Sequence, residues 1–402
     1  MAFDPLAPDF QRNPYPYYDD LRRETPFLFY EAWKMWFVSR YDDVNTLLRD
    51  RRLGRTMDHI ISREERGLPP LPPALAPFNK LSQNSMFDKE PPEHTRLRSL
   101  VHKVFTPRRV ESLRDRIESI ANALLDEVAA QGEMDVLADF AVPLPVTVIA
   151  ELLGVPEQDR HRLRPWSHDI VAMYELDHTP EQERQAIQAA EEFSDYLQHL
   201  AEARRTEPTD DLITALALVE ESGDRLTMDE LISTCVLLLN AGHEATVNVI
   251  GNGLHGLFSA PQQLRLLVEN PQLTSSAIEE LLRYDTPLQL FRRWVLEDME
   301  YKGHFFKQGT ELGLMFGAAN RDPDRFHMPD VLDITREDNG HVSFGGGVHF
   351  CLGAPLARLE LVIAFKALLR RCQNLQLLEE SHFRDTYVIR GLESLKVGFE
   401  TR

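Results

Sequence analysis

Apolar residues recur every three to four positions along much of this 402-residue chain, the spacing that gives a helix one apolar face. The pattern predicts amphipathic helices over 109–130, 179–205 and 228–259. The last one opens on Thr227-Met-Asp-Glu230, a capping-box pattern. Strand-like alternation is confined to short pieces, at 34–39, 299–301, 311–315 and 394–399. We therefore expect a mainly α fold with small β-sheets.

Composition narrows the class of protein. The formal net charge of −20 disfavours nucleic-acid binding. The first twenty residues hold four aspartates and no apolar core, and no uninterrupted run of about 18 apolar residues predicts a membrane span. The chain shows no internal repeat and no linker, and the Pro-rich stretch at 67–74 is typical of a surface loop. We expect a cytoplasmic protein without a membrane partner.

Two of the three cysteines have an ordinary interpretation. Cys235 and Cys372 lie in helical, largely apolar stretches, where a cysteine usually acts as a small buried hydrophobe. The count is odd and the spacing unpaired, so the sequence predicts no disulfide framework and favours a reducing compartment.

Cys351 has a different setting. Glycines 345–347 precede it, and the residues after it predict a helix with Pro355 in the first turn. The N–H groups and positive end of that helix would face the sulfur. Because a thiolate is the ligating form of cysteine, this position suits an axial ligand to haem iron. A zinc site that includes His349 is the alternative, although no second Cys/His pair stands at finger-like spacing.

The segment Phe344-x-x-Gly347-x-His349-x-Cys351-x-Gly353 resembles the haem-binding signature of cytochrome P-450 monooxygenases, and the resemblance extends over essentially the whole chain. It looks closest to the soluble bacterial type. The resemblance implies one large domain over residues 1–402, mainly α with small β-sheets, in which a long central helix crosses the haem. It also implies haem b (iron protoporphyrin IX) as the cofactor, Cys351 as the iron ligand, and Phe344, Gly347 and Gly353 beside the ring.

The same resemblance assigns partners to the two haem propionates. His94 and Arg98 stand at i and i+4 on one helical face, Arg293 lies in a later segment, and His349 comes two residues before the cysteine. Arginine suits this role because its fork binds a carboxylate bidentately. Arg292 leaves the register of that segment open.

The middle of the predicted 228–259 helix resembles the family's oxygen-binding segment, whose usual form ends in an acid and an alcohol. Glu244 supplies the acid, but Ala245 stands at the alcohol position. Thr246 follows, yet one helical step turns a side chain by about 100°, so we do not expect it to substitute. These three are the catalytic candidates. Either a substrate hydroxyl or ordered water replaces the missing alcohol, or the enzyme couples poorly or works better with peroxide.

Glu280-Leu-Leu-Arg283 resembles the family's structural Glu-x-x-Arg pair. The spacing alone is weak, because it recurs at 111–114, 157–160 and 202–205, where it predicts helix-surface pairs. We assign Glu280 and Arg283 a structural role from their place, about seventy residues before the cysteine.

The resemblance also places a substrate pocket. Its predicted lining is Phe87, Ala241, Leu288, Leu290 and Phe291, with 166–176 as a roof and Ala245 leaving extra room. We expect an apolar small organic substrate. Ordinary core packing is the alternative for all of these residues.

No flavin or iron–sulfur domain is recognisable in the chain, so we expect electrons from a separate ferredoxin and ferredoxin reductase, or a flavodoxin. Basic residues on two predicted helices could form a docking surface for this electron donor; the alternative is that they are separate solvated groups. They are Arg96, Lys103, Arg108, Arg109, Lys366, Arg370 and Arg371. The sequence therefore predicts a monomeric haem-thiolate monooxygenase that uses O2 and two electrons. The alternatives are a hydrogen-peroxide-dependent peroxygenase and a non-catalytic haem sensor or ligand-binding protein.

Overall fold

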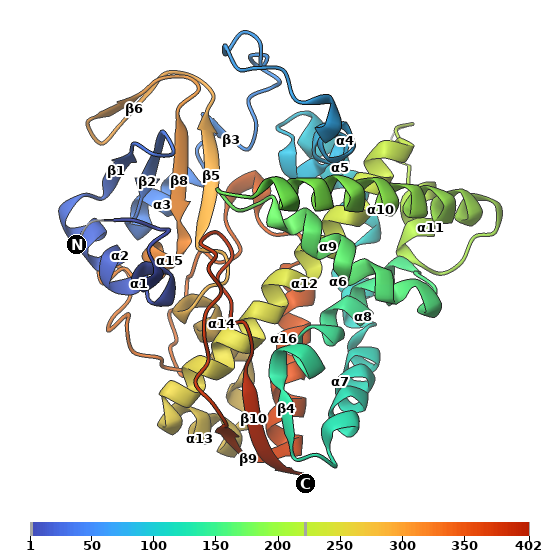
Figure 1. Cartoon of the computed structure of the whole chain (residues 1–402), viewed down its shortest axis with the longest axis vertical. Helices are drawn as coiled ribbons and strands as arrows, with labels where there is room; N and C mark the ends of the chain where they lie inside the picture. Colours follow the sequence, from blue (N-terminus) through green and yellow to red (C-terminus); the bar gives the residue numbers. More distant parts are fainter. Residues whose placement is uncertain (1–2, 221–222, 402) are drawn as a thin grey trace.

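A long helix, α12 (Met228–Ser259), runs through the middle of the molecule (Figure 1). Its predicted bounds are confirmed, and so is its capping box: the Glu230 N–H donates to Thr227 Oγ1 at 3.2 Å, and the Thr227 N–H donates to the Glu230 carboxylate at 2.8 Å. The helix is buried on nearly every side and contacts α4, α8, α14 and α16. The computed structural model describes residues 3–220 and 223–401.

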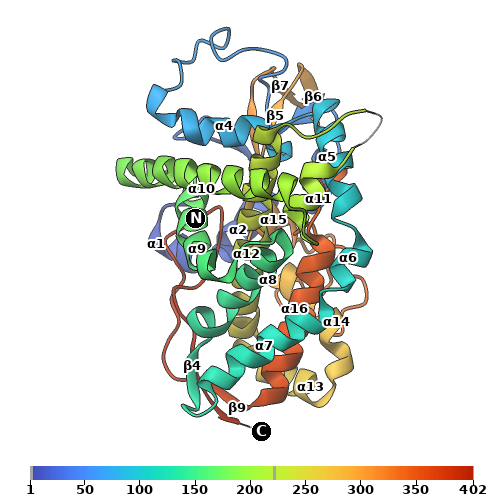
Figure 2. The same cartoon turned by 90° about the vertical axis from the view of Figure 1, so that its right-hand side faces the viewer.

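The other helices surround α12. Those that precede it are α1 (Pro8–Arg12), α2 (Tyr15–Glu24), α3 (Tyr41–Leu47), α4 (Ala76–Asn84), α5 (Glu93–Val104), α6 (Pro107–Glu111), α7 (Arg114–Val128), α8 (Pro143–Leu153), α9 (Leu163–Ala172), α10 (Pro180–Thr206) and α11 (Leu212–Leu218). Those that follow are α13 (Pro261–Glu269), α14 (Thr274–Tyr284), α15 (Phe316–Ala319) and α16 (Ala354–Arg371). Figure 2 shows α4 lying above α10, with the segment before α4 extending beyond it.

The predicted helix over 109–130 is interrupted. It is α6 and α7, separated at Ser112 and Leu113. The Ser112 hydroxyl donates to the Arg109 carbonyl at 2.7 Å, a local bond that competes with the helical ladder. The predicted 179–205 helix is α10, with Thr179 as its N-cap.

The strands form small sheets: in Figure 1 the sheet that contains β8 and β5 lies to the left of most of the helices, and the sheet of β4, β10 and β9 lies at the bottom. They are β1 (Phe27–Tyr30), β2 (Met35–Val38), β3 (Leu53–Gly54), β4 (Glu133–Asp135), β5 (Leu290–Val295), β6 (Met299–Tyr301), β7 (His304–Phe306), β8 (Glu311–Met315), β9 (Cys372–Leu377) and β10 (Lys396–Thr401). The largest sheet has the order β1-β2-β8-β5-β3, in which β2 and β8 pair in parallel. The mainly α fold with small sheets is confirmed, although β5 was not predicted as a strand.

The main hydrophobic core extends from Leu81 to Phe399 and includes most of α12. Cys235 and Cys372 are buried in it, as predicted, although Cys372 begins β9 rather than lying in a helix. The expectation of no span-like stretch needs correction: Val136–Leu153 is long and apolar enough to cross a membrane. Because 67% of this stretch is buried inside the protein, we assign it to the core.

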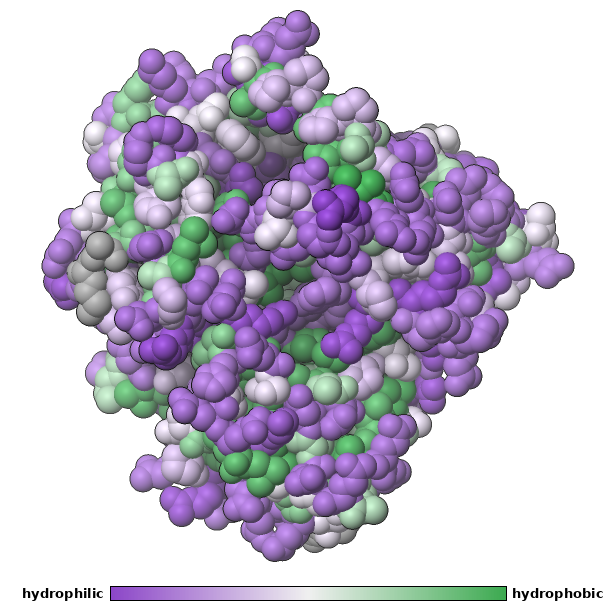
Figure 3. All heavy atoms as spheres, viewed as in Figure 1, coloured by the Kyte–Doolittle hydropathy of each residue, from purple (hydrophilic) through white to green (hydrophobic). Residues whose placement is uncertain are grey.

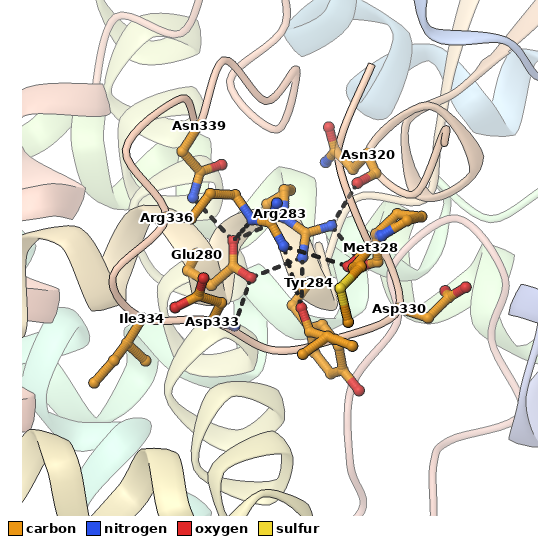
Figure 4. A network of polar contacts seen from close by, with 12 residues as sticks. Glu280, Arg283, Tyr284, Asn320, Met328, Asp330, Asp333, Ile334, Arg336 and Asn339 are labelled. Atoms are coloured by element: carbon orange, nitrogen blue, oxygen red, sulfur yellow. Dashed lines mark hydrogen bonds and ion pairs between the residues drawn. The ribbon is translucent and has the colours of Figure 1, made fainter. Parts of the chain in front are cut away.

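A fully buried ion pair joins α14 to the segment that leads to the cysteine. Arg283 donates to both Glu280 carboxylate oxygens at 2.8 Å, and neither side chain is exposed. The third guanidinium nitrogen of Arg283, Nη1, donates to the carbonyls of Asn320 and Pro329. Glu280 also accepts from Arg336, and Figure 4 shows these partners converging from three segments. The pair therefore fixes the fold of 320–339 against α14.

Candidate functional site

The loop that carries Cys351 is shaped by glycine. Gly345 and Gly347 have φ of +70° and +68°, the left-handed region that favours glycine. A Cβ on Gly347 would also stand 2.6 Å from the Leu48 carbonyl oxygen, so no other residue fits there unchanged. The Cys351 N–H donates to the Phe344 carbonyl at 2.9 Å and closes the loop just before α16. The predicted turn, cysteine and helix are all present.

Burial raises the pKa of the Cys351 thiol, because a thiolate is poorly solvated inside the protein. Several groups act in the opposite direction. The backbone N–H groups of Gly353 and Ala354 donate to the sulfur, and the charges of Arg98 and Arg358 face it. The site thus carries the donors and positive charges that favour the thiolate form of Cys351.

Two histidines lie against each other close to this loop. The rings of His94 on α5 and His349 have centroids 4.3 Å apart, and His349 Nε2 lies 3.0 Å from a Glu90 carboxylate oxygen. His94 is buried, its Nδ1 has no hydrogen-bond partner among the described residues, and burial lowers the pKa of His94 to about 4. Arg98 donates to the Phe350 carbonyl at 2.7 Å. Glu90 was missed, since no motif links it to a residue 259 positions away.

Arg293 is a buried cation without an anion. It is 2% exposed, and among the described residues no carboxylate lies within 4 Å of its guanidinium; its hydrogen bond is to the Arg292 carbonyl. Burial, aided by the charge of Arg55, lowers the pKa of Arg293 to about 9. Arg292 instead pairs with Glu311, so its charge already has a partner. Because a buried guanidinium is costly without a counter-ion, Arg293 fits a bound carboxylate.

A stripe on α12 remains accessible in the middle of the protein. Ala241 and Ala245, one turn apart, are exposed, and Leu237 one turn earlier is half-buried, whereas Asn240 and His243 are buried. Small side chains on an accessible stripe leave room for a flat ring against the helix. With the sulfur loop and the unpaired Arg293, these residues fit haem.

The acid next to this stripe is partly buried and charged. Glu244 lies 3.4 Å from His243 Nε2. Burial alone would raise the pKa of Glu244, but His243 and Arg384 outweigh it and lower the pKa. The Thr246 hydroxyl is buried and donates to the Gly242 carbonyl at 3.3 Å, so it does not replace the missing alcohol. A Cβ on Gly242 would make only an ordinary 3.6 Å contact with Ile149, so close helix packing does not explain this glycine.

Of the predicted pocket residues, Phe87 and Phe291 contact each other, whereas Leu288 and Leu290 pack with the hydrophobic core. Phe87 and Phe291 contact each other with ring centroids 5.9 Å apart, and Phe87 lines a cleft beside α4, on a face that Figure 3 shows to be hollowed. The prediction that Leu290 lines the pocket is wrong, because Leu290 is 1% exposed and packs in the core with Phe10 and Tyr18. Neighbouring residues of β5 point to opposite faces, so Leu290 and Phe291 cannot share a wall. Leu288 packs partly buried between two core clusters.

Comparisons with known proteins agree with this geometry. The family model described as Cytochrome P450 matches residues 70–388. The chain belongs to the cytochrome P450 family. Among its relatives is the polyketide biosynthesis cytochrome P450 PksS of Bacillus subtilis (strain 168), 40% identical, with 99% of this chain and 98% of that protein covered. The vitamin D(3) 25-hydroxylase of Pseudonocardia autotrophica is 41% identical, covering 98% of this chain and 96% of that one.

Solved structures give the same result. The crystal structure of P450BioI in complex with hexadec-9Z-enoic acid ligated acyl carrier protein has a TM-score of 0.92 and 38% identity, covering 98% of this chain and 99% of that one. Members of the family bind haem b through a cysteine thiolate. This P450 is therefore an oxidoreductase, a haem monooxygenase that oxidises an organic substrate.

Proposed function

We propose that the Cys351 thiolate would bind the iron of haem b and that His94, Arg98, Arg293 and His349 would hold the propionates. The unpaired, buried guanidinium of Arg293 is the observation that carries this assignment, because it needs an anion that the described residues do not supply. Phe344, Gly347 and Gly353 shape the loop under the ring. When bound, the haem supplies the activation of O2 with two electrons, and the thiolate favours O–O cleavage.

The residues of α12 then control protons and space. Glu244, held charged beside His243 and Arg384, is the group that passes protons towards the oxygen side. Ala241 and Ala245 keep the stripe open for substrate. Since Ala245 lacks a hydroxyl and the Thr246 hydroxyl is taken by Gly242, a hydroxyl of the substrate, or water held by it, completes the proton path.

The test of the ligand uses cysteine variants. In the reduced, carbon-monoxide-treated protein, C351A should lose the red-shifted absorption of a sulfur-ligated haem, whereas C235A, which alters a buried cysteine elsewhere, should keep it. If the two variants gave the same spectrum, Cys351 would not be the haem ligand.

The test of the proton path uses A245T. With substrates that carry a hydroxyl, wild type should give more product per hydrogen peroxide released than with substrates that lack one, and A245T should reduce that difference. A ratio that no substrate and no variant changes would contradict the substrate-assisted path.

A second candidate function is hydrogen-peroxide-dependent oxidation, favoured by the same absence of an alcohol at position 245. If peroxide alone supports turnover faster than reductase-supplied electrons, this P450 acts as a peroxygenase. Absence of turnover with both would favour a haem sensor or ligand-binding protein.

We propose a separate ferredoxin with its reductase, or a flavodoxin, as the electron donor. Arg108 on α6 and Lys366 and Arg370 on α16 are exposed, so they are available for docking this donor. Arg96 forms ion pairs with Asp224 and Glu230, so we exclude it from the proposed docking surface. The rate of first-electron transfer should fall as salt rises. A rate insensitive to ionic strength would contradict docking here. A cytoplasmic location, a monomeric state and one domain over 1–402 stay predictions.

A further inference from the structure

The cleft beside α4 is not purely apolar. Its apolar lining consists of Phe78, Leu81, Phe87, Ile170, Val236 and Leu237. Polar side chains complete the lining: Ser82, Ser85, Asp88, Tyr174 and Ser233. Leu237 lies one turn before Ala241 on α12, so the cleft adjoins the stripe that we propose faces the haem.

Asp88 is a carboxylate with unused capacity to accept hydrogen bonds. Its ion partner is Arg55, at 3.5 Å, longer than the 2.7–2.9 Å usual for a charge-assisted bond. Among the described residues no other side chain or backbone group donates to this carboxylate. Burial raises the pKa of the Asp88 carboxyl and outweighs the charge of Arg55, which lowers it. Arg55 therefore compensates only part of the cost of burying this carboxylate.

Arg55 cannot turn fully to Asp88, because other groups hold it. Its guanidinium carbon lies 4.2 Å from the Phe87 ring centroid and 4.7 Å from that of Phe291. Its Nη1 donates to the Arg292 carbonyl at 2.9 Å. Since both ring contacts and this bond fix the guanidinium, the free side of Asp88 faces the cleft rather than a protein cation.

A second, independent observation marks the same corner. Asn240, next to Ala241, is 2% exposed, and among the described residues neither its side-chain oxygen nor its nitrogen has a hydrogen-bond partner within 3.5 Å, so its contact with Tyr174 is a long one. It interacts with Tyr174, whose accessible surface lines the cleft. Burial and then the charge of Asp88 raise the pKa of Tyr174 to about 12, so the phenol is neutral and can donate as well as accept. Buried amide groups normally have partners, so this corner is built for a polar ligand group.

We propose that the substrate carries a hydrogen-bond donor, a hydroxyl or an ammonium group, which binds Asp88 with Tyr174 and Asn240 beside it. The apolar remainder lies on Phe87 and Leu237 and extends towards Ala241. The inference rests on the proposed function and names the substrate class of that site.

The test compares three ten-carbon probes, 1-decanol, decylammonium and decanoate, by calorimetric titration and by the spin-state shift of the haem. Wild type should bind 1-decanol or decylammonium at least about 10-fold more tightly than decanoate, as a hydrogen bond to a charged group allows. Whichever of the two donors binds more tightly identifies the substrate group. D88N should remove most of that preference. D115N, which changes an exposed aspartate on α7, should keep it.

Y174F serves as the second variant, and it should weaken binding of the preferred donor several-fold even if D88N does not fold. Tighter binding of decanoate, increased further in D88N, would assign the anchor to Arg55 and overturn the proposal. Equal affinities in wild type, D88N and Y174F would overturn it as well. Both results are read in protein that shows the carbon-monoxide band of a sulfur-ligated haem, so they are distinct from failure of the proposed function, in which that band is absent.

Discussion

Replacing Arg283 by alanine should destabilise the protein by about 3–5 kcal/mol, the usual effect of removing one partner of a buried ion pair. The structure shows where this magnitude comes from. R283A leaves the carbonyls of Asn320 and Pro329 without their donor, each at about 1–3 kcal/mol. It does not leave Glu280 alone, because Arg336 still donates to it at 3.0 Å. We therefore expect a loss within this range rather than above it.

The chain offers a matched control with the same Glu-x-x-Arg spacing. Glu111 and Arg114 also form an ion pair, but their side chains are 61% and 43% exposed. R114A should therefore change stability by no more than about 1 kcal/mol. The identical motif thus separates the effect of burial from the effect of sequence.

The assay is urea unfolding followed by far-ultraviolet circular dichroism, with the free energy of unfolding extrapolated at constant slope. Haem content is measured on the same samples. If R283A does not accumulate, R283K keeps the charge but loses the bidentate fork, and should fall between wild type and complete loss. Equal losses for R283A and R114A would refute the argument, because burial would then play no part.

Three other variants test the site. Despite burial, Arg358 and His341 lower the folded-state pKa of Glu279 from 4.5 to about 2. The charged carboxylate therefore contributes at most about 3 kcal/mol of stability, which is complete above pH 4.5 and is lost as the pH falls to about 2. E279Q should lack this pH-dependent contribution. Urea titrations over that range measure it. Arg293→Gln should raise the dissociation constant for haem at least about tenfold, as loss of a charged hydrogen bond implies. The control Arg292→Gln should leave that constant unchanged. G347A should prevent stable haem uptake because its Cβ meets backbone, while G67A, at the same φ of +68° with open space around it, should cost only about 1–2 kcal/mol.

The sequence was sufficient where the signal is local or belongs to a motif. The capping box and apolar composition defined α12 to the residue, and the glycine turn before Cys351 defined the loop and the start of α16. The interruption at Ser112 could not be read in advance, because a serine hydroxyl bonded to the backbone is also compatible with an unbroken helix.

The residues that sequence reasoning missed depend on tertiary packing. Glu90 meets His349, and Asp88 meets Arg55, only because distant segments come together. The two consecutive arginines in β5 hid its alternation, and the strand register then placed Leu290 in the core and Arg293 towards the site. A pattern of residue types cannot give such a register without the neighbouring strand.

The accessible stripe of α12 has a consequence for engineering. Most of this helix is committed to the core on its other sides; a Cβ on Gly251 or Gly253, for example, would come within 3 Å of a neighbouring leucine side chain. By contrast, Ala241 and Ala245 are exposed and can change size without disturbing that packing, whereas Leu237 also packs against the core. A mutant library restricted to codons 241 and 245 should therefore diversify the products of the enzyme while most clones remain folded.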